Sequence, residues 1–143
     1  KKNESPAAAG NDMAKQKSEL AQWPVQLHLV SPTAPYFRNS DVVLAADCSA
    51  FAMGSFHGDL LRGKSLAIAC PKLDSGLDEY AAKIKSMIDD AKINTLTVVR
   101  MEVPCCGGLT GLAKSALSTA SRKIPIKEIV LSLQGEIISE NWI

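Results

Sequence analysis

Apolar residues along this chain fall into short runs, and their spacing predicts strands that alternate with helices. Two of the runs are almost continuously apolar and bounded by turn residues, which is typical of strands covered on both faces of a sheet. The other runs alternate apolar with polar residues or are rich in β-branched residues, which also favours strands. The predicted strands are residues 25–30, 41–46, 65–69, 96–103 and 128–133, followed by a turn at Gln134-Gly135 and a short hairpin strand, EIIS.

Three stretches between the strands have helical spacing. Residues 77–88 carry one apolar face, and Ser75 with Asp78 has the spacing of a capping box at its start. Residues 109–120 carry a second apolar stripe, and residues 50–61 form a third stretch, interrupted by glycine and phenylalanine. Strands alternating with helices imply right-handed crossovers and a parallel sheet with helices on both faces. We therefore expect a three-layer α/β fold, flavodoxin-like or Rossmann-like, with about five strands and a short C-terminal hairpin.

The length of 143 residues suits one packed core rather than two domains. Residues 1–18 are rich in polar and small residues and poor in large apolar ones, so we expect a flexible tail or linker there and the α/β domain over residues 19–143. Because the sequence begins with Lys1 rather than Met, we also expect that it is a piece of a longer polypeptide.

Charge and hydropathy exclude several classes of partner. The 16 basic and 15 acidic residues are scattered, so the sequence presents no basic stripe for nucleic acid. It has no apolar run near the roughly 20 residues of a membrane-spanning helix, and its first segment is polar where a secretory signal would be apolar. We expect a cytoplasmic protein with no membrane partner. In that reducing compartment, four cysteines favour metal binding or redox chemistry over disulfides.

All four cysteines stand where a strand-like run ends. Cys48 closes DVVLAADC, Cys70 closes SLAIAC, and Cys105 with Cys106 closes LTVVRMEVPCC. If these runs are neighbouring parallel strands, their carboxyl ends lie on one edge of the sheet, where open α/β folds bind their ligands. Thiolates are the ligands that iron–sulfur clusters and zinc prefer. The sequence therefore predicts a metal or cluster site at this edge, assembled by the fold because the spacings are too wide for a C-x-x-C motif.

Other interpretations of these residues stay open. A free cysteine is often buried simply as a small apolar residue. The adjacent pair, Cys105 and Cys106, could point to opposite sides or form a strained disulfide. His57 lies near enough in sequence to Cys48 to be an auxiliary ligand, although a lone histidine is more often a packed or surface residue. The glycines after Cys106 lack the G-x-G-x-x-G spacing of a dinucleotide-binding loop.

A family resemblance runs through the stretches that carry the cysteines. These stretches are QWPVQLHLVSPTAPYF, AADCSAFAMGSFHGDLLRGK, ACPKLD and TVVRMEVPCCGGL. Over about residues 19–138 the chain resembles the carboxyl-terminal domain of ferredoxin-like 4Fe-4S binding proteins of anaerobic bacteria and archaea. In such proteins a segment resembling a two-cluster ferredoxin, with C-x-x-C-x-x-C motifs, precedes this domain, and no such segment is present in this sequence. The resemblance implies electron transfer and leaves only the four cysteines of this chain as candidate ligands.

Together these observations favour an electron-relay module rather than an enzyme. We expect Cys48, Cys70, Cys105 and Cys106 to hold an iron–sulfur cluster of unknown type, with His57 as an auxiliary ligand; zinc or no metal are the alternatives. The expected partner is a redox protein or a ferredoxin-like domain of the same polypeptide, and a homo-oligomer stays open. The main alternative is a metal-free docking or oligomerisation module with structural or thiol-switch cysteines. A weaker alternative is a thiol enzyme with Cys105 or Cys106 as the nucleophile.

Overall fold

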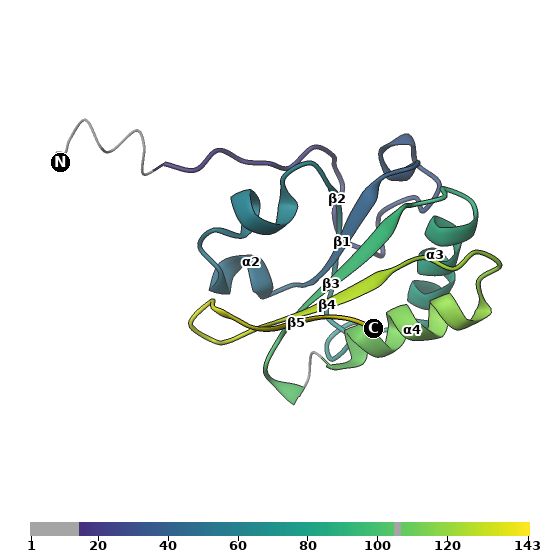
Figure 1. The fold of residues 1–143 in the computed structure, drawn as a ribbon. Coiled ribbons are helices and arrows are strands. Elements are labelled where there is room, and N and C mark those ends of the chain that lie inside the picture. The colour runs from purple at the N-terminus through teal and green to yellow at the C-terminus, as the bar shows by residue number, and fades with distance from the viewer. Residues whose placement is uncertain (1–14, 105–106) are drawn as a thin grey trace, which may run out of the picture.

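A computed structural model of the chain describes residues 15–104 and 107–143 and contains one five-stranded sheet in the order β2-β1-β3-β4-β5 (Figure 1). The first four strands are parallel, and β5 runs antiparallel to β4. This is the flavodoxin-like strand order with a reversed last strand, so the expected mostly parallel α/β sheet is confirmed. The strands are β1 (Asp41–Ala46), β2 (Ser65–Ala69), β3 (Thr95–Met101), β4 (Ile126–Leu131) and β5 (Ile137–Trp142).

Helices cover both faces of the sheet and make three layers. Figure 1 shows α3 and α4 together on one side, with α2 and η2 on the other. The helical elements are η1 (Pro35–Phe37), α2 (Ser49–Ala52), η2 (His57–Leu61), α3 (Leu77–Asp89) and α4 (Gly107–Thr119). Among the described residues no helix is long and apolar enough to cross a bilayer.

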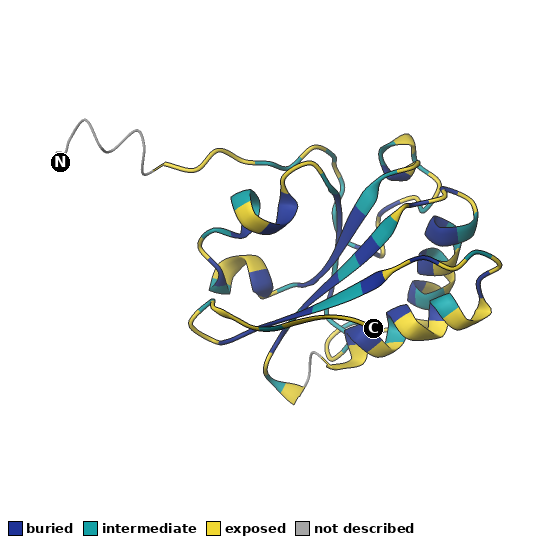
Figure 2. Cartoon of the chain, in the orientation of Figure 1, coloured by how far each residue is buried: buried dark blue, intermediate teal, exposed yellow. Residues whose placement is uncertain are grey.

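The core lies between the sheet and its helices, because the sequence places apolar residues on both faces of the central strands. Residues 42–46 of β1 are all buried, as their continuous apolar run predicts. The buried positions of α3 are Tyr80, Ile84, Met87 and Ile88, which share one helical face. Figure 2 shows the same division, with buried positions in the strands and on the inward faces of the helices.

The predicted strand over residues 25–30 is wrong. Only Gln26 pairs with the sheet, through an isolated parallel bridge to Ile68, and the chain then turns. Leu27 and Val30 are buried while the two residues between them are exposed. The alternation in the sequence depended on Leu29, which is apolar but exposed in this turn, so the apolar pattern did not report which side chains are buried.

Two other predictions need correction. The single helix expected over residues 50–61 is split, because Met53 adopts an extended conformation after α2 and Gly54 follows in a turn before the π-helical η2. The capping box at Ser75 is not formed: α3 is preceded by Gly76 in the left-handed conformation, and no side chain caps its first turn. Glycine accepts that conformation at no steric cost, so the chain enters α3 without a side-chain cap.

Candidate functional site

The candidate site lies where the carboxyl ends of the central strands meet. After β1 the chain crosses to β2, and after β3 it crosses to β4, so the two connections leave neighbouring strands in opposite directions. Such a switch point in the strand order opens a crevice outside the carboxyl ends, where open α/β sheets bind ligands. The loops that border this crevice follow Ala46, at the end of β1, and Met101, at the end of β3.

Two of the four cysteines lie at adjacent strand ends of this edge. Ala46 of β1 is in register with Ala69 of β2, and the Asp47 N–H donates a hydrogen bond of 3.1 Å to the Ala69 carbonyl oxygen. Cys70 follows β2 directly, and Cys48 follows β1 after Asp47. Cys48 is exposed, Cys70 is partly exposed, and both are free thiols. The fold therefore places two accessible sulfur atoms on neighbouring loops of one sheet edge.

The start of α4 reaches the same place. A Cβ atom added at Gly108 would lie 3.2 Å from the Cβ of Pro71, so the first turn of α4 lies closely against the turn that follows Cys70. A side chain at position 108 would press on this contact. Cys105 and Cys106 immediately precede α4 in the sequence and lie outside the described residues. Their predicted role as ligands stays a prediction.

A hydrogen-bonded carboxylate holds the turn at Cys70. Asp74 accepts the Cys70 N–H at 3.0 Å and the hydroxyl of Tyr80 through the same oxygen. Partial burial opposes ionisation, but these two donors hold the pKa of Asp74 below its usual value, so it is a carboxylate at neutral pH. Sequence reasoning placed Tyr80 in the core and missed that its hydroxyl supports this turn; its helical spacing carries no signal of the bond.

The pKa of Asp47 is shifted in the opposite direction to that of Asp74. Burial first, and the negative charge of Asp74 second, raise the pKa of Asp47 above its usual value. Among the described residues, its Oδ1 atom is the buried side-chain oxygen that has no hydrogen-bond partner. A buried polar atom without a partner costs free energy, so a cation or hydrogen-bond donor at this position would be stabilising.

His57 is engaged elsewhere. Its Nδ1 accepts the Glu19 N–H at 2.9 Å, which ties η2 to the N-terminal segment and leaves only Nε2 for another partner. It does line an apolar cavity of about 150 Å³ together with Asp47 and Phe51. In the part of the chain that is described, no three Cys, His, Asp or Glu side chains come together as a metal-binding group. The predicted role of His57 as an auxiliary ligand stays a prediction.

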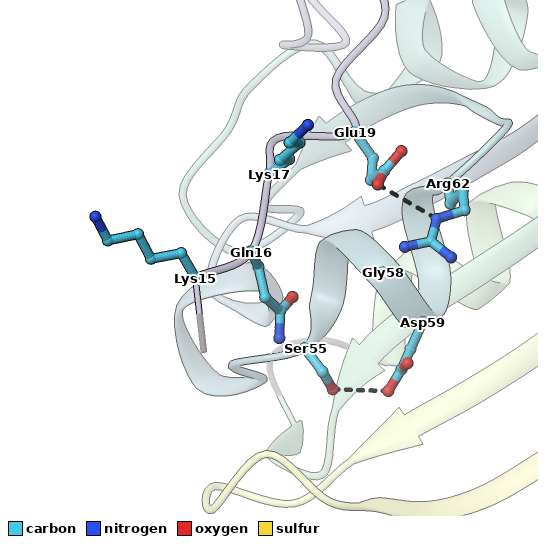
Figure 3. Close-up of a pocket in the computed structure, with 8 residues that line it drawn as sticks. All are labelled: Lys15, Gln16, Lys17, Glu19, Ser55, Gly58, Asp59 and Arg62. Carbon is cyan, nitrogen blue, oxygen red and sulfur yellow. Dashed lines mark hydrogen bonds and ion pairs between the residues drawn. The ribbon is translucent and has the colours of Figure 1, made fainter. Parts of the chain in front are cut away.

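A larger cavity of about 460 Å³ lies between the N-terminal segment and η2 (Figure 3). Of the charged groups that line it, Arg62 contacts Glu19 at 3.3 Å and Asp59 accepts the hydroxyl of Ser55 at 2.7 Å, and Lys15 and Lys17 complete the set. None of the residues that line it is a cysteine. We do not assign the site to this cavity. The predicted tail over residues 1–18 falls mostly on residues 1–14, which lie outside the described residues.

Comparison with known families agrees with this geometry. A family model described as a Rossmann-like domain matches residues 34–143. The chain belongs to this Rossmann-like domain family. The Rossmann-like domain is also 29% identical to an uncharacterized protein of Archaeoglobus fulgidus over 121 residues, which covers 83% of each chain. No solved structure matches it.

The predicted resemblance to ferredoxin-like 4Fe-4S binding proteins is therefore wrong. The model that matches is a Rossmann-like domain, and the relative from Archaeoglobus fulgidus is not described as an iron–sulfur protein. Two of the stretches that suggested the resemblance, AADCSAFAMGSFHGDLLRGK and ACPKLD, begin at the last residues of β1 and β2 and continue into the turns that carry Cys48 and Cys70. A site on this Rossmann-like domain has to be argued from its own residues.

Proposed function

We propose that this Rossmann-like domain binds an iron–sulfur cluster, or a single thiolate-bound metal ion, at the carboxyl edge of its sheet. The observation that carries the proposal is the placement of Cys48 and Cys70 on adjacent strand ends beside the switch point of the sheet. Thiolates are the ligand class that iron–sulfur clusters and zinc favour. Both thiols are accessible and neither is engaged in a disulfide, so both are available as ligands.

The loop composition supports a metal rather than a dinucleotide. In Rossmann-like dinucleotide sites, the turn after the first strand carries glycines that let the backbone approach a pyrophosphate. The corresponding turn here reads Asp47-Cys48-Ser49, without glycine and with a thiol. Glycines occur instead in the first turn of α4, where Gly108 lies against Pro71. Cys105 and Cys106 precede those glycines in sequence, so we infer that they supply the remaining ligands.

Two carboxylates stand beside the proposed ligands at this edge. Asp74 keeps a negative charge and fixes the backbone at Cys70. The unpartnered oxygen of Asp47 adds a second carboxylate to the same edge. Four thiolates already make a bound zinc ion or cluster anionic overall, so these carboxylates would add negative charge beside it and lower the reduction potential of a cluster. His57 is not required in this arrangement.

A cluster held here would supply one-electron redox chemistry. The residues of this chain would bind it, hold Cys70 in place through Asp74, and expose the centre on the side of Cys48. We infer that the electron partner is a redox protein, or another domain of the same polypeptide, that approaches this exposed edge. The chain would act as a relay and not as an enzyme.

Metal content in matched variants tests the proposal. The full chain is purified without oxygen, and iron, zinc and acid-labile sulfide are measured per protein in the wild type, Cys48→Ser and Cys70→Ser. Asp59→Asn, an exposed change on η2, serves as the control. We expect bound metal in the wild type and the control and its loss in both cysteine variants, with thermal unfolding showing that the fold persists. Metal-free wild type, or cysteine variants with full metal content, would contradict the proposal.

A metal-free thiol switch is the second candidate function. It is favoured by the same two free and accessible thiols on neighbouring loops. The metal measurement separates the two functions, since a switch predicts a metal-free wild type. Such protein would also lose two titratable thiols when it is oxidised by a disulfide reagent and regain them on reduction.

A further inference from the structure

The two edge strands of the sheet, β2 and β5, differ in how far the rest of the chain covers their outward backbone groups. At the β2 edge, the side-chain amide of Gln22 accepts the Leu66 N–H and donates to the Leu66 carbonyl oxygen, both at 2.8 Å. The Leu27 N–H donates to the Ile68 carbonyl oxygen, and the Ile68 N–H donates to Val25, both at 2.9 Å. The N-terminal segment thus satisfies the outward backbone groups of β2. Natural sheets cover an edge in this way because an open one pairs with other chains.

The β5 edge has no such cover among the described residues. No residue of β5 is buried, and Figure 2 shows the strand exposed over almost its whole length. Ile138 is 54% exposed and Trp142 is 63% exposed. The Ile143 N–H donates inward to the Ile126 carbonyl oxygen, so the alternation of an antiparallel ladder turns the backbone groups of Trp142 and Glu140 outward.

We propose that β5 pairs antiparallel with the β5 of a second copy of this chain. A two-fold axis through Glu140 would place Ile138 of each copy opposite Trp142 of the other, so exposed apolar side chains meet apolar ones. Pairs of aromatic and β-branched residues across strands are stabilising. Such a contact is self-complementary and uses one edge per copy, so it closes as a dimer and joins two five-stranded sheets. The irregular register at Val130/Leu131 leaves Ile138 between their partners Ser139 and Ile137. The regular part of β5 that can pair is therefore residues 139–142, and Ile138 would meet Trp142 from the irregular position.

Charge at the centre of this contact is balanced within each copy. The symmetric arrangement brings Glu140 opposite itself, and like charges in that position are destabilising. Lys127 offsets this, because its Nζ lies 2.7 Å from Glu140 Oε2 and 5.1 Å from the centre of the Trp142 ring. The second copy therefore meets a nearly neutral strand with an apolar residue on either side of the axis.

Sedimentation at several protein concentrations tests the dimer with two matched variants. We expect the wild type to associate to twice the 15.3 kDa of the chain. Glu140→Pro removes an outward N–H without touching the ladder to β4, and Glu140→Ala removes only the charge. We expect Glu140→Pro to raise the dissociation constant roughly tenfold or more, because two interstrand hydrogen bonds are lost per dimer. Glu140→Ala should bind its copy at least as tightly as the wild type.

Ile138→Lys is a second disruptive change that avoids proline, and Leu29→Lys is its control, since Leu29 is equally a large exposed apolar residue away from β5. We expect the first to give monomer and the second to leave the dimer unchanged, with circular dichroism showing folded protein throughout. A wild type that stays monomeric at every concentration would overturn the proposal. So would a dimer that Ile138→Lys and Glu140→Pro leave intact, or one that Glu140→Ala dissociates.

Discussion

The turn between β4 and β5 is fixed against α2, and one glycine makes that contact possible. Gly135 has φ +85°, and a Cβ atom added there would lie 2.0 Å from the carbonyl oxygen of Ala52. Gly135→Ala therefore has two costs. The left-handed conformation costs an L-residue about 1–2 kcal/mol, and the forced movement of packed backbone adds about 1–3 kcal/mol. We expect the free energy of unfolding to fall by roughly 2–5 kcal/mol.

Gly63→Ala separates the two costs. Gly63 has a similar φ of +76°, but nothing lies within 4 Å of the added Cβ, so this variant carries the conformational cost alone. Urea unfolding followed by circular dichroism gives the free energy of unfolding for the wild type and both variants. Gly135→Ala should lower the free energy of unfolding clearly more than Gly63→Ala does. Equal losses in the two variants would refute the argument that the hairpin turn is pressed against α2.

Three further predictions concern charged groups. Hydrogen bonding by Thr110, and then the Arg100 guanidinium, outweigh burial and hold the pKa of Glu128 below its usual value. The contribution of Glu128 to the free energy of unfolding is therefore present above its pKa in the unfolded chain and is lost as the pH falls through its pKa in the folded protein. Thr110→Val should cost about 1.5–3 kcal/mol at pH 7 and flatten the acid limb of a urea-unfolding series; an unchanged acid limb would contradict this. The raised pKa of Asp47 has the opposite effect, because its ionised form destabilises the folded protein. Asp47→Asn should therefore stabilise metal-free protein at neutral pH and not in acid, as thermal unfolding at both pH values would show. Lys83 donates to three backbone carbonyl oxygens of the turn over residues 27–30, at 2.7–2.9 Å. Lys83→Met should lower the free energy of unfolding by roughly 2 kcal/mol, a loss that urea unfolding would detect.

Much of the sheet could be predicted from the sequence. The strands over residues 41–46 and 65–69 have the predicted bounds, because a continuous apolar run bounded by turn residues specifies a buried strand. The same reasoning placed Cys48 and Cys70 at strand ends. Residues 25–30 were predicted wrongly, since the exposed Leu29 completes an alternation of apolar residues although only Leu27 and Val30 are buried.

The cover of the β2 edge and the support of the candidate site depend on contacts that no local pattern reports. Gln22 covers the backbone of Leu66, 44 positions along the chain, and nothing in its neighbours indicates this. Tyr80 occupies an ordinary buried position of a helix, and its bond to Asp74 follows only once the sheet and α3 are packed together. Such tertiary hydrogen bonds are set by the three-dimensional arrangement and not by periodicity.

X-ray absorption at the metal edge of anoxically purified protein tests directly whether thiolates bind a metal here, because it reports the atoms bound to the metal. We expect a shell of sulfur ligands, at about 2.3 Å if the metal is zinc, that is lost or weakened in Cys48→Ser and in Cys70→Ser. A metal surrounded only by oxygen and nitrogen, or a sulfur shell that both variants retain, would contradict a thiolate site at the carboxyl edge of the sheet.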